Sequence, residues 1–365
     1  MERIKVAIVL PYFGAGGAEK MVFRLAAGMD QDRYHIEVFC VYGPPQKNSM
    51  EEILREKGIK LHHIGKKLGF SPKAVRKLFQ SLDHFAPDLI HTHMYACVYA
   101  ALWPLIRNKP FLHTFHTLPE VENARLTRRL LTKWLVSRNR MIPVAISEGN
   151  QRLVADYYHV SADRVPMVHN PVDVQRFAAG KRIEDGVFRF ITVGRFSKEK
   201  NQQLMYRAFA AFLARGYEAR LLLLGKGEEE ANLKALAEEL GISDRIDYAG
   251  HVDNVEDYLK TADVFLLSSH YEAQPLCVLE AMASGLPVIS TDVGAVSDIV
   301  KDNGILVPPG DVEAMAKAME KLWLDENLRI KMSERASVYA AEYDVSGTVA
   351  GYSELYQRYA NGNNQ

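Results

Sequence analysis

The segment 270–291 carries two glutamates, Glu272 and Glu280, within a mostly apolar stretch. Its pattern predicts a helix over Pro275–Ser284, with proline as its first residue and Gly285 as its cap. Glu272 then lies in the loop before the helix N-terminus, and Glu280 lies about one and a half turns inside. Carboxylates accept hydrogen bonds from sugar hydroxyls, and a helix N-terminus attracts phosphate. The segment predicts a site for a ligand with hydroxyls and phosphates, and two exposed helix-face glutamates are the ordinary alternative.

Cations follow another strand-like segment, Phe188–Val193. Gly194 comes next, followed by Arg195, Lys198 and Lys200 within six positions. Positive side chains at the carboxyl end of a strand suit an anionic ligand. A solvated basic loop is the alternative, although Arg195 directly after the glycine favours binding.

Glycines also follow the first predicted strand, Ile4–Leu10. Gly16 and Gly17 stand before a predicted helix, where backbone N–H groups can approach a phosphate closely. A dinucleotide fingerprint is a weaker interpretation, because its third glycine is missing and no acidic residue ends the second strand at 40–43. A flexible turn between strand and helix is the remaining alternative.

Short apolar strands alternate with helix-like segments along the whole chain, which indicates parallel sheets built from βαβ units. The pattern occurs twice, so the fold class is α/β with two doubly wound domains, and a ligand is expected in the cleft between them. The predicted strands are Ile4–Leu10, His35–Tyr42, Ile59–Ile64, Asp88–Thr92, Phe111–Phe115, Ile142–Ile146, Arg164–His169, Phe188–Val193, Ala219–Leu224, Arg245–Tyr248, Val264–Leu267, Pro287–Ser290 and Gly304–Val307.

The turn-rich segment Asn170–Gly186 predicts the join between the domains. The predicted division is 1–175, 176–345 and a C-terminal helix at 346–365 that packs back on the N-terminal domain. That helix has a stripe of tyrosines at positions 352, 356 and 359.

The composition is that of a globular protein, with 365 residues, 48% apolar and 25% charged. No apolar run is long enough to span a membrane, and the start is typical of a strand and not of a signal peptide. The three scattered cysteines suit a reducing cytoplasm and fit no zinc site. The net charge of zero conceals a basic half: residues 1–180 hold 25 Lys and Arg against 16 Asp and Glu, so the rest of the chain is equally acidic.

Together these residues resemble glycosyltransferase family 4, the retaining nucleotide-sugar enzymes with the GT-B fold, over nearly the whole chain. The motifs are Gly-Gly-Ala-Glu at 16–19, Val-Gly-Arg at 193–195 with a lysine five residues later, Leu-Leu-Gly-Lys-Gly-Glu at 223–228, and the Glu272/Glu280 pair followed by Ala-Met-Ala-Ser-Gly-Leu-Pro-Val-Ile at 281–289. The last motif is the most specific of the four.

The resemblance implies that Arg195 and Lys200 hold the donor diphosphate, helped by the backbone amides of Leu276 and Cys277. It also implies that Glu280 takes the ribose hydroxyls. These positions agree with what the residue types alone predict.

The resemblance further implies that Gly16 and Gly17 close over the phosphates and that the base lies near Lys226 and Val252. His116 matches best the histidine that lies beside the transferred sugar.

The resemblance also places Glu272 on hydroxyls of the donor sugar. The chain departs from the family pattern here, since Ala-Gln-Pro follows Glu272 in place of Gly-Phe-Gly, and Thr117 stands where aspartate often follows the histidine. A third departure is Asn170-Pro in place of Asn-Gly. The first two leave the identity of the sugar open, and none affects the diphosphate residues.

The predicted function is transfer of a hexosyl-type group from a nucleotide diphosphate, UDP being favoured, to an acceptor hydroxyl in cell-surface polysaccharide or glycoconjugate synthesis. No Asp-x-Asp pair follows a strand, so we expect cations to replace a metal ion and no cofactor to be needed. A nucleotide-sugar epimerase of the same fold and a degenerate sugar-binding subunit are the alternatives. The expected partners are the donor and a glycan or lipid-linked acceptor, and no nucleic acid.

A basic segment, Arg125–Arg140, predicts a helix with a broad apolar stripe and no acidic residue. One interpretation is an ordinary packed helix with a solvated basic face. The other is contact with an anionic membrane surface, which makes the protein a cytoplasmic enzyme on the inner face of the membrane. The cations that extend the predicted patch are Lys66, Lys67, Lys73, Arg76 and Lys77.

Overall fold

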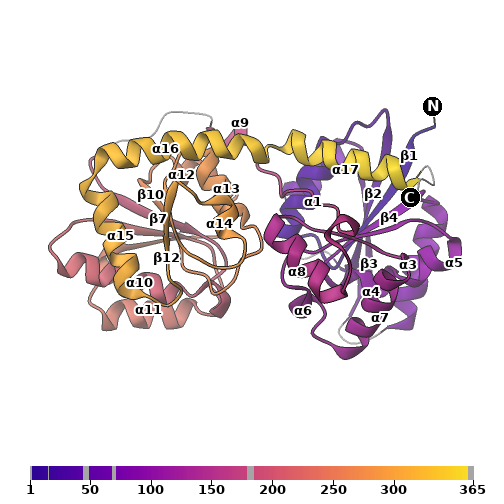
Figure 1. Cartoon of the computed structure of the whole chain (residues 1–365), viewed down its shortest axis with the longest axis horizontal. Coiled ribbons are helices and arrows are strands. Elements are labelled where there is room, and N and C mark those ends of the chain that lie inside the picture. The colour runs from indigo at the N-terminus through magenta and orange to yellow at the C-terminus, as the bar shows by residue number, and fades with distance from the viewer. Residues whose placement is uncertain (1, 15, 44–48, 68–70, 179–184, 361–365) are drawn as a thin grey trace. The chain divides into compact units, whose positions relative to one another are not determined.

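The chain forms two compact units, each built on a six-stranded parallel sheet flanked by helices (Figure 1). The first unit comprises Met1–Pro171 with Val345–Gln365, and the second comprises Val172–Asp344. The two doubly wound sheets predicted from the sequence are confirmed. This computed structural model describes residues 2–14, 16–43, 49–67, 71–178 and 185–360.

The first sheet has the strand order β3-β2-β1-β4-β5-β6, so the order reverses between β1 and β4. Its strands are β1 (Ile4–Leu10), β2 (Tyr34–Tyr42), β3 (Lys60–Lys66), β4 (Leu89–His93), β5 (Phe111–Thr114) and β6 (Ile142–Val144). The helices of this unit are α1 (Gly17–Gly28), α2 (Ser49–Glu56), α3 (Pro72–Phe85), α4 (Cys97–Ala100), α5 (Leu102–Arg107), α6 (Pro119–Glu122), α7 (Leu126–Ser137), α8 (Glu148–Tyr158) and α17 (Val345–Ala360).

The second sheet repeats this topology in the order β12-β11-β10-β7-β8-β9, and its order reverses between β7 and β10. Its strands are β7 (Arg189–Val193), β8 (Arg220–Leu224), β9 (Ile246–Gly250), β10 (Val264–Leu267), β11 (Val288–Thr291) and β12 (Gly304–Val307). The helices of this unit are α9 (Val174–Ala178), α10 (Gln202–Ala214), α11 (Glu230–Glu239), α12 (Val255–Leu259), α13 (Leu276–Ala283), α14 (Val296–Ile299), α15 (Val312–Leu324) and α16 (Glu326–Ala340).

The central strands are apolar on both faces because helices cover both faces of a doubly wound sheet. In β1 the run Val6–Leu10 is completely buried, and all four residues of β10 are buried. A continuous apolar run of this kind marks a central parallel strand, which is why the sequence locates these strands well.

One predicted strand, Arg164–His169, is wrong. Its first residue ends a short 3₁₀ turn, and only an isolated bridge joins Met167 to Ala145 beside β6. Pro166 has no N–H to donate, so the segment cannot build a longer ladder. It passes along the sheet edge without becoming a seventh strand.

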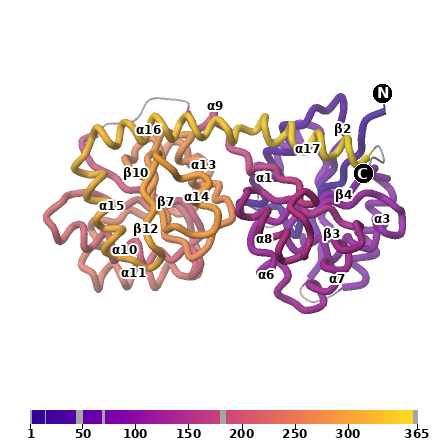
Figure 2. The backbone as a smooth tube through the Cα atoms, in the orientation of Figure 1, coloured from indigo at the N-terminus to yellow at the C-terminus, as the bar shows by residue number. Residues whose placement is uncertain are grey.

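The C-terminal helix α17 belongs to the first unit, where it runs beside α1 (Figure 2). Tyr352 and Tyr356 from the predicted stripe are fully buried there. A Cβ atom on Gly28 at the end of α1 would lie 2.9 Å from a methyl carbon of Val349, so glycine permits this close helix contact. The predicted return of this helix to the N-terminal domain is confirmed.

Candidate functional site

The predicted site residues lie at the carboxyl ends of strands, close to the point where each sheet reverses its strand order. In the second unit Arg195 follows β7 and Glu272 follows β10. In the first unit Gly16 follows β1 and His116 follows β5. Ligands of open α/β sheets bind at such edges, because the loops diverge there and leave a crevice.

Glycines hold together the loops that follow β7 and β8. Gly225 has φ +142°, and a Cβ atom there would lie 1.9 Å from the carbonyl oxygen of Gly194. A Cβ atom on Gly227 would lie 2.1 Å from the oxygen of Phe196. The amide of Phe196 donates to the oxygen of Lys226 over 3.1 Å. The Gly-Lys-Gly motif is therefore required so that the two backbones can touch and fix the loop after β7.

The Arg195 side chain is largely exposed on that loop. Its guanidinium is 72% exposed and donates to the Glu228 carboxylate from Nε over 3.1 Å. An exposed ion pair contributes little free energy, so the arginine is free to turn to an anionic ligand. Two residues expected near the base lie at the neighbouring strand ends: Lys226, exposed, follows β8, and Val252, half-buried, follows β9.

A partly buried ion pair joins Lys200, whose side chain is 28% exposed, to the buried Glu272. Lys200 Nζ donates to Glu272 Oε1 over 2.5 Å, and Ser269 Oγ donates to the same oxygen over 2.6 Å. Burial lowers the pKa of Lys200, but the charges of Glu272 and then Cys277 outweigh it, so the pKa is raised and the ammonium stays charged. The sequence predicts that Lys200 and Glu272 each bind the donor, but it does not predict that they form an ion pair with each other. The available signal was their opposite charge at the ends of adjacent strands β7 and β10.

The helix α13 begins at Leu276, so Pro275 is its N-cap and the prediction of proline as the first helical residue is wrong. The ψ of Pro275 is 116°, which is extended and not helical. The helix ends at Ala283, and Gly285 follows with φ +73°, as its predicted role in the cap requires. Cys277, half-buried, lies in the first turn.

Both glutamates of the motif are buried, so the alternative of two exposed helix-face residues is wrong. Glu272 is 9% exposed and Glu280 is 1% exposed. Burial lowers the pKa of nearby Arg176, but its bonds to Glu256 and the charges of Glu256, Asp173 and Glu280 outweigh burial, so the pKa is raised. Arg176 already binds both carboxylate oxygens of Glu256, over 2.9 and 3.1 Å. The buried Glu280 carboxylate is thus near the Arg176 guanidinium, whose bidentate partner is Glu256.

In the first unit α1 begins at Gly17, with Gly16 as its N-cap, and both glycines are exposed. A Cβ atom on Gly16 would lie 2.5 Å from Glu19 Oε2. Glu19 is buried, and burial raises the pKa of its carboxyl group. The glycine therefore leaves room for Glu19 to fold back against the helix N-terminus, a burial that the motif at 16–19 does not predict.

Two histidines meet at the carboxyl ends of β4 and β5. His93 Nδ1 lies 2.9 Å from His116 Nε2, and the Glu122 carboxylate accepts the backbone N–H of His116 over 2.7 Å. Burial lowers the pKa of His116 to about 4, although Glu122 opposes this shift, so the imidazole is neutral at neutral pH. The sequence missed His93, although a histidine two positions after His91 on one strand puts both on the same face.

A buried ring nitrogen of His93 that has no hydrogen-bond partner indicates which of the two rings donates the hydrogen bond between them. In the described part of the chain, His93 Nε2 has no hydrogen-bond partner. If His116 donated, His93 would carry a buried N–H without an acceptor, which is rarer than an unused lone pair. We therefore place the donor on His93 Nδ1, so that His116 keeps its own proton on Nδ1 and can present it to a ligand.

A hydrogen-bond network connects these strands to α17. His91 Nδ1 lies 2.7 Å from the Tyr356 hydroxyl, and His91 Nε2 lies 2.8 Å from Thr114 Oγ1. Thr114 Oγ1 in turn lies 2.8 Å from the Tyr352 hydroxyl. The ring centroids of His91 and His93 are 4.2 Å apart, so α17 supports β4, the strand that carries His93.

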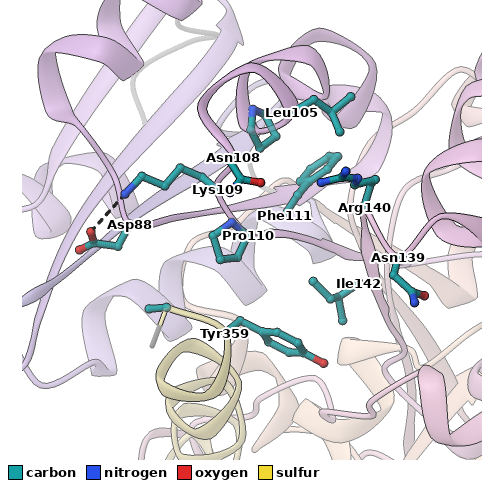
Figure 3. Close-up of a pocket in the computed structure, with 12 residues that line it drawn as sticks. Asp88, Leu105, Asn108, Lys109, Pro110, Phe111, Asn139, Arg140, Ile142 and Tyr359 are labelled. Atoms are coloured by element: carbon teal, nitrogen blue, oxygen red, sulfur yellow. Dashed lines mark ion pairs between the residues drawn. The ribbon is translucent and has the colours of Figure 1, made fainter. Parts of the chain in front are cut away.

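A cavity of about 320 Å³ lies elsewhere in the first unit (Figure 3). Residues just before or at the starts of β4, β5 and β6 line it, together with Tyr359 of α17, and Lys109 pairs with Asp88 across its rim at 3.6 Å. It therefore opens at the amino ends of the strands, the edge opposite the candidate residues. Conventional ligand sites of this topology are not found there.

Comparison with known proteins assigns the family. The family model described as Glycosyltransferase Family 4 matches residues 15–176, and the model described as Glycosyl transferases group 1 matches residues 173–338. A D-inositol 3-phosphate glycosyltransferase of Corynebacterium jeikeium is 30% identical over 306 residues, covering 74% of this chain and 72% of that protein. The chain belongs to the group 1 glycosyltransferases.

One further relative and one solved structure are similar to this glycosyltransferase. N-acetyl-alpha-D-glucosaminyl L-malate synthase of Bacillus anthracis is 36% identical over 170 residues, covering 46% of this chain and 44% of that protein. The crystal structure of Anabaena HepE in complex with UDP-glucose superposes with a TM-score of 0.84 at 20% identity, covering 97% of this chain and all of that one. The glycosyltransferase thus has the GT-B fold predicted from its motifs.

Proposed function

We propose that this glycosyltransferase is a retaining, metal-independent enzyme that moves a hexosyl group from a UDP-sugar to an acceptor hydroxyl in cell-surface polysaccharide or glycoconjugate synthesis. The related Anabaena structure holds UDP-glucose, which supports the donor class. Two relatives are named for inositol phosphate and malate as acceptors, so acceptors within the family vary widely.

One observation carries the proposal: the partly buried Lys200–Glu272 pair lies near Cys277 in the first turn of α13, and Arg195 stands five residues before Lys200 in the loop after β7. Breaking the bond between the anomeric carbon and the diphosphate leaves an electron pair and negative charge on the diphosphate. Fixed positive charge and helix amides stabilise that charge without reorganising, which is the largest catalytic term in many enzymes. The Glu272 carboxylate, beside Lys200, then accepts hydrogen bonds from the hydroxyls of the donor sugar.

The experiment that tests this function is a thermal-shift panel of nucleotide sugars, followed by turnover assays with candidate acceptors in the presence of a chelator. We expect a UDP-sugar to raise Tm and transfer to need an acceptor but no added metal. An epimerase would change the sugar in the absence of any acceptor. A degenerate sugar-binding subunit would show neither transfer nor slow hydrolysis, and a strict manganese requirement would contradict the metal-free proposal.

Glu280→Ala is expected to raise the donor KM about tenfold or more while kcat falls less. The lost contacts are hydrogen bonds to ribose hydroxyls, which form in the ground state as well as in the transition state. Steady-state kinetics with the donor varied measure this. Glu239→Ala, an exposed change on α11, is the matched control. Unchanged donor affinity in Glu280→Ala would remove this residue from the site.

His116→Ala is expected to lower kcat by about 10- to 100-fold, the loss expected for one hydrogen bond made to developing charge. UDP affinity should stay near normal, because the histidine contacts the sugar and not the nucleotide. His84→Ala on the exposed face of α3 is the control. Because the pKa of His116 is lowered to about 4, its imidazole stays neutral between about pH 7 and 5, and protonation of His116 should not lower the wild-type kcat in that range. A large loss of UDP affinity would contradict the placement.

The membrane proposal gains support from α7, which exposes an apolar row. Leu126, Leu130 and Trp134, spaced four apart, are 59%, 59% and 48% exposed. Arg125 and Arg129 are exposed as well. An exposed apolar row with flanking cations fits the surface of an anionic bilayer. Among the described residues no helix is both long and apolar enough to span a membrane.

Two predicted members of the basic patch do not belong to it. Lys66 is only 5% exposed and lies against Tyr42, so its assignment to a lipid-facing surface is wrong. Arg128 stacks on Tyr95 and donates to a backbone oxygen, so it is not a free surface cation. The helix itself spans Leu126–Ser137 and is shorter than predicted.

Changing Arg125, Arg129 and Arg138 together to Gln is expected to weaken binding to anionic vesicles by roughly two orders of magnitude, since each cation near such a surface contributes about 1 kcal/mol. Vesicle co-sedimentation at low salt measures the effect. The charge-matched control changes three exposed lysines of α15 and α16, Lys317, Lys321 and Lys331, to Gln. If the unmodified protein does not bind anionic vesicles at low salt, the membrane proposal is wrong, and a soluble acceptor is the better proposal.

A further inference from the structure

A buried glutamate at the end of α6, Glu122, binds two histidines of the β5 segment. Its Oε1 accepts the backbone N–H of His116 over 2.7 Å, and its Oε2 lies 3.3 Å from His113 Nε2. The Glu122 side chain is 6% exposed, and His113, the third residue of β5, is 1% exposed. One buried carboxylate therefore joins the strand β5 to the loop that follows it.

The hydrogen bonds around the Glu122 carboxylate have one consistent direction. Burial lowers the pKa of His116, and the charge of Glu122 opposes this shift, as an ionised carboxylate does. An ionised carboxylate only accepts, so His113 Nε2 carries the proton of its bond to Glu122. His113 Nδ1 lies 2.9 Å from Thr92 Oγ1, whose hydroxyl can donate to it. Both carboxylate oxygens and both ring nitrogens of His113 then have partners within the protein.

The turn that carries Glu122 is itself fixed by the next residue. Asn123 is 3% exposed, and its Nδ2 donates to the Pro119 oxygen over 2.9 Å and to the Tyr158 hydroxyl over 3.1 Å. Its Oδ1 accepts from the Thr132 hydroxyl over 3.3 Å. Tyr158 belongs to α8 and Thr132 to α7, so two helices hold the end of α6. A carboxylate on such a support has little freedom to move.

His116 is held at two points, one on its ring and one on its backbone. His93 Nδ1 lies 2.9 Å from the ring nitrogen Nε2, and Glu122 accepts the backbone N–H. The first contact sets which ring nitrogen carries the proton, and the second sets where the backbone of the residue lies. A displacement of about 1 Å at a catalytic group costs up to about 10² in rate, so the backbone contact matters to a group that meets the reacting sugar.

We propose that Glu122 is a positioning residue, which acts on glycosyl transfer through His116. The inference rests on the proposed function, in which His116 contacts the transferred sugar. Glu122 does not itself bind substrate, because His113 and the His116 amide already occupy its two carboxylate oxygens. It fixes the loop between β5 and α6, and that loop fixes the ring that meets the sugar. Loss of Glu122 therefore lowers activity by no more than loss of His116 itself.

The test is a double-mutant cycle on kcat, made on the full chain with the UDP-sugar and acceptor that the turnover assays identify. We expect Glu122→Ala to lower kcat about tenfold, within the loss predicted for His116→Ala, while the donor KM changes less than about twofold. In a His116→Ala background Glu122→Ala should have no further effect, because the group through which it acts is absent. Glu122→Gln keeps an oxygen for the His116 amide and should retain most of the activity. Glu120→Ala, exposed on the same helix, is the matched control and should leave kcat unchanged.

A second readout needs no substrate. In protein labelled with ¹⁵N-histidine, the amide proton of His116 should resonate well downfield, because it is bonded to a charged acceptor over 2.7 Å. Glu122→Ala should move this signal upfield, and Glu120→Ala should not. If Glu122→Ala does not fold, Glu122→Asp takes its place, since it keeps the charge but withdraws the carboxylate by one methylene. It should change the amide signal and kcat in the same directions.

The outcomes separate this inference from the proposed function. An equal loss of kcat from Glu122→Ala with and without His116 would overturn the inference, by showing that Glu122 acts independently. Wild-type kcat or an unchanged His116 amide signal in Glu122→Ala would overturn it too, as would a Glu122→Gln variant as inactive as Glu122→Ala, which would assign the effect to charge. Failure of the wild type to transfer from any UDP-sugar would overturn the proposed function, and the amide signal would still report whether Glu122 holds His116.

Discussion

Lys200→Ala is expected to lower kcat by about 10²- to 10³-fold, the loss seen when one fixed donor to developing negative charge is removed. It should also lower stability by about 3 kcal/mol, since it leaves the Glu272 carboxylate buried without its cation. Ser269 still donates to that oxygen, but a hydroxyl does not replace a full charge. Turnover with saturating donor and chemical denaturation measure the two effects separately.

The control that separates catalysis from stability is the double variant Lys200→Ala with Glu272→Gln. Removing both charges relieves the unpaired carboxylate, so stability should return to near the wild-type value while activity stays low. Arg195→Ala should lower kcat comparably without the loss of stability, because its partner Glu228 is exposed. Wild-type turnover in Lys200→Ala would show that the lysine only holds Glu272 in place.

Gly294→Ala is expected to lower kcat/KM by about 10²-fold although the residue contributes no side chain. A Cβ atom there would lie 1.9 Å from the carbonyl oxygen of Glu272, so the loop must move by more than about 1 Å. A displacement of that size at a catalytic group costs about two orders of magnitude in rate. The amide of Ala295 also donates to this oxygen over 3.0 Å, and that bond should weaken.

Gly310→Ala is the matched control for Gly294→Ala. Gly310 has φ +80° and open space around it, whereas Gly294 has φ +56° and the backbone contact. Both substitutions carry the cost of a left-handed alanine, and only one pushes the Glu272 loop. Equal effects of the two on kcat/KM would show that backbone strain, and not displacement of the site, is responsible.

The strands and the loops that follow them could be predicted because their signals are local. Twelve of the thirteen predicted strands occur in the sheets, within a few residues of their predicted ends. The exception, Arg164–His169, has an apolar pattern but lies at the edge, where Pro166 prevents a ladder. The C-terminal helix, predicted at 346–365, occurs at Val345–Ala360, with its tyrosines as the signal, and residues 361–365 lie outside the described part of the chain.

The contacts between side chains of different strands could not be predicted in the same way. The Lys200–Glu272 pair depends on β7 and β10 being neighbours, which follows from topology and not from either segment alone. The burial of Lys66 depends on two tyrosines from separate segments, Tyr42 and Tyr99, so the basic stretch alone predicts an exposed lysine. Residue type indicates what a side chain can do, and only the sheet order indicates what it meets.

The position of α17 has a consequence for synthesis on the ribosome. The buried hydroxyls that meet His91 and Thr114 come from Tyr356 and Tyr352, which are translated after the whole of the second unit. At about 5–20 residues per second, the first sheet waits roughly 10–35 s for them. During that interval the groove for α17 on β1 and α1 is open, with apolar surface and buried polar groups exposed. The N-terminal half of the nascent chain is therefore an expected client for chaperones until the last helix emerges.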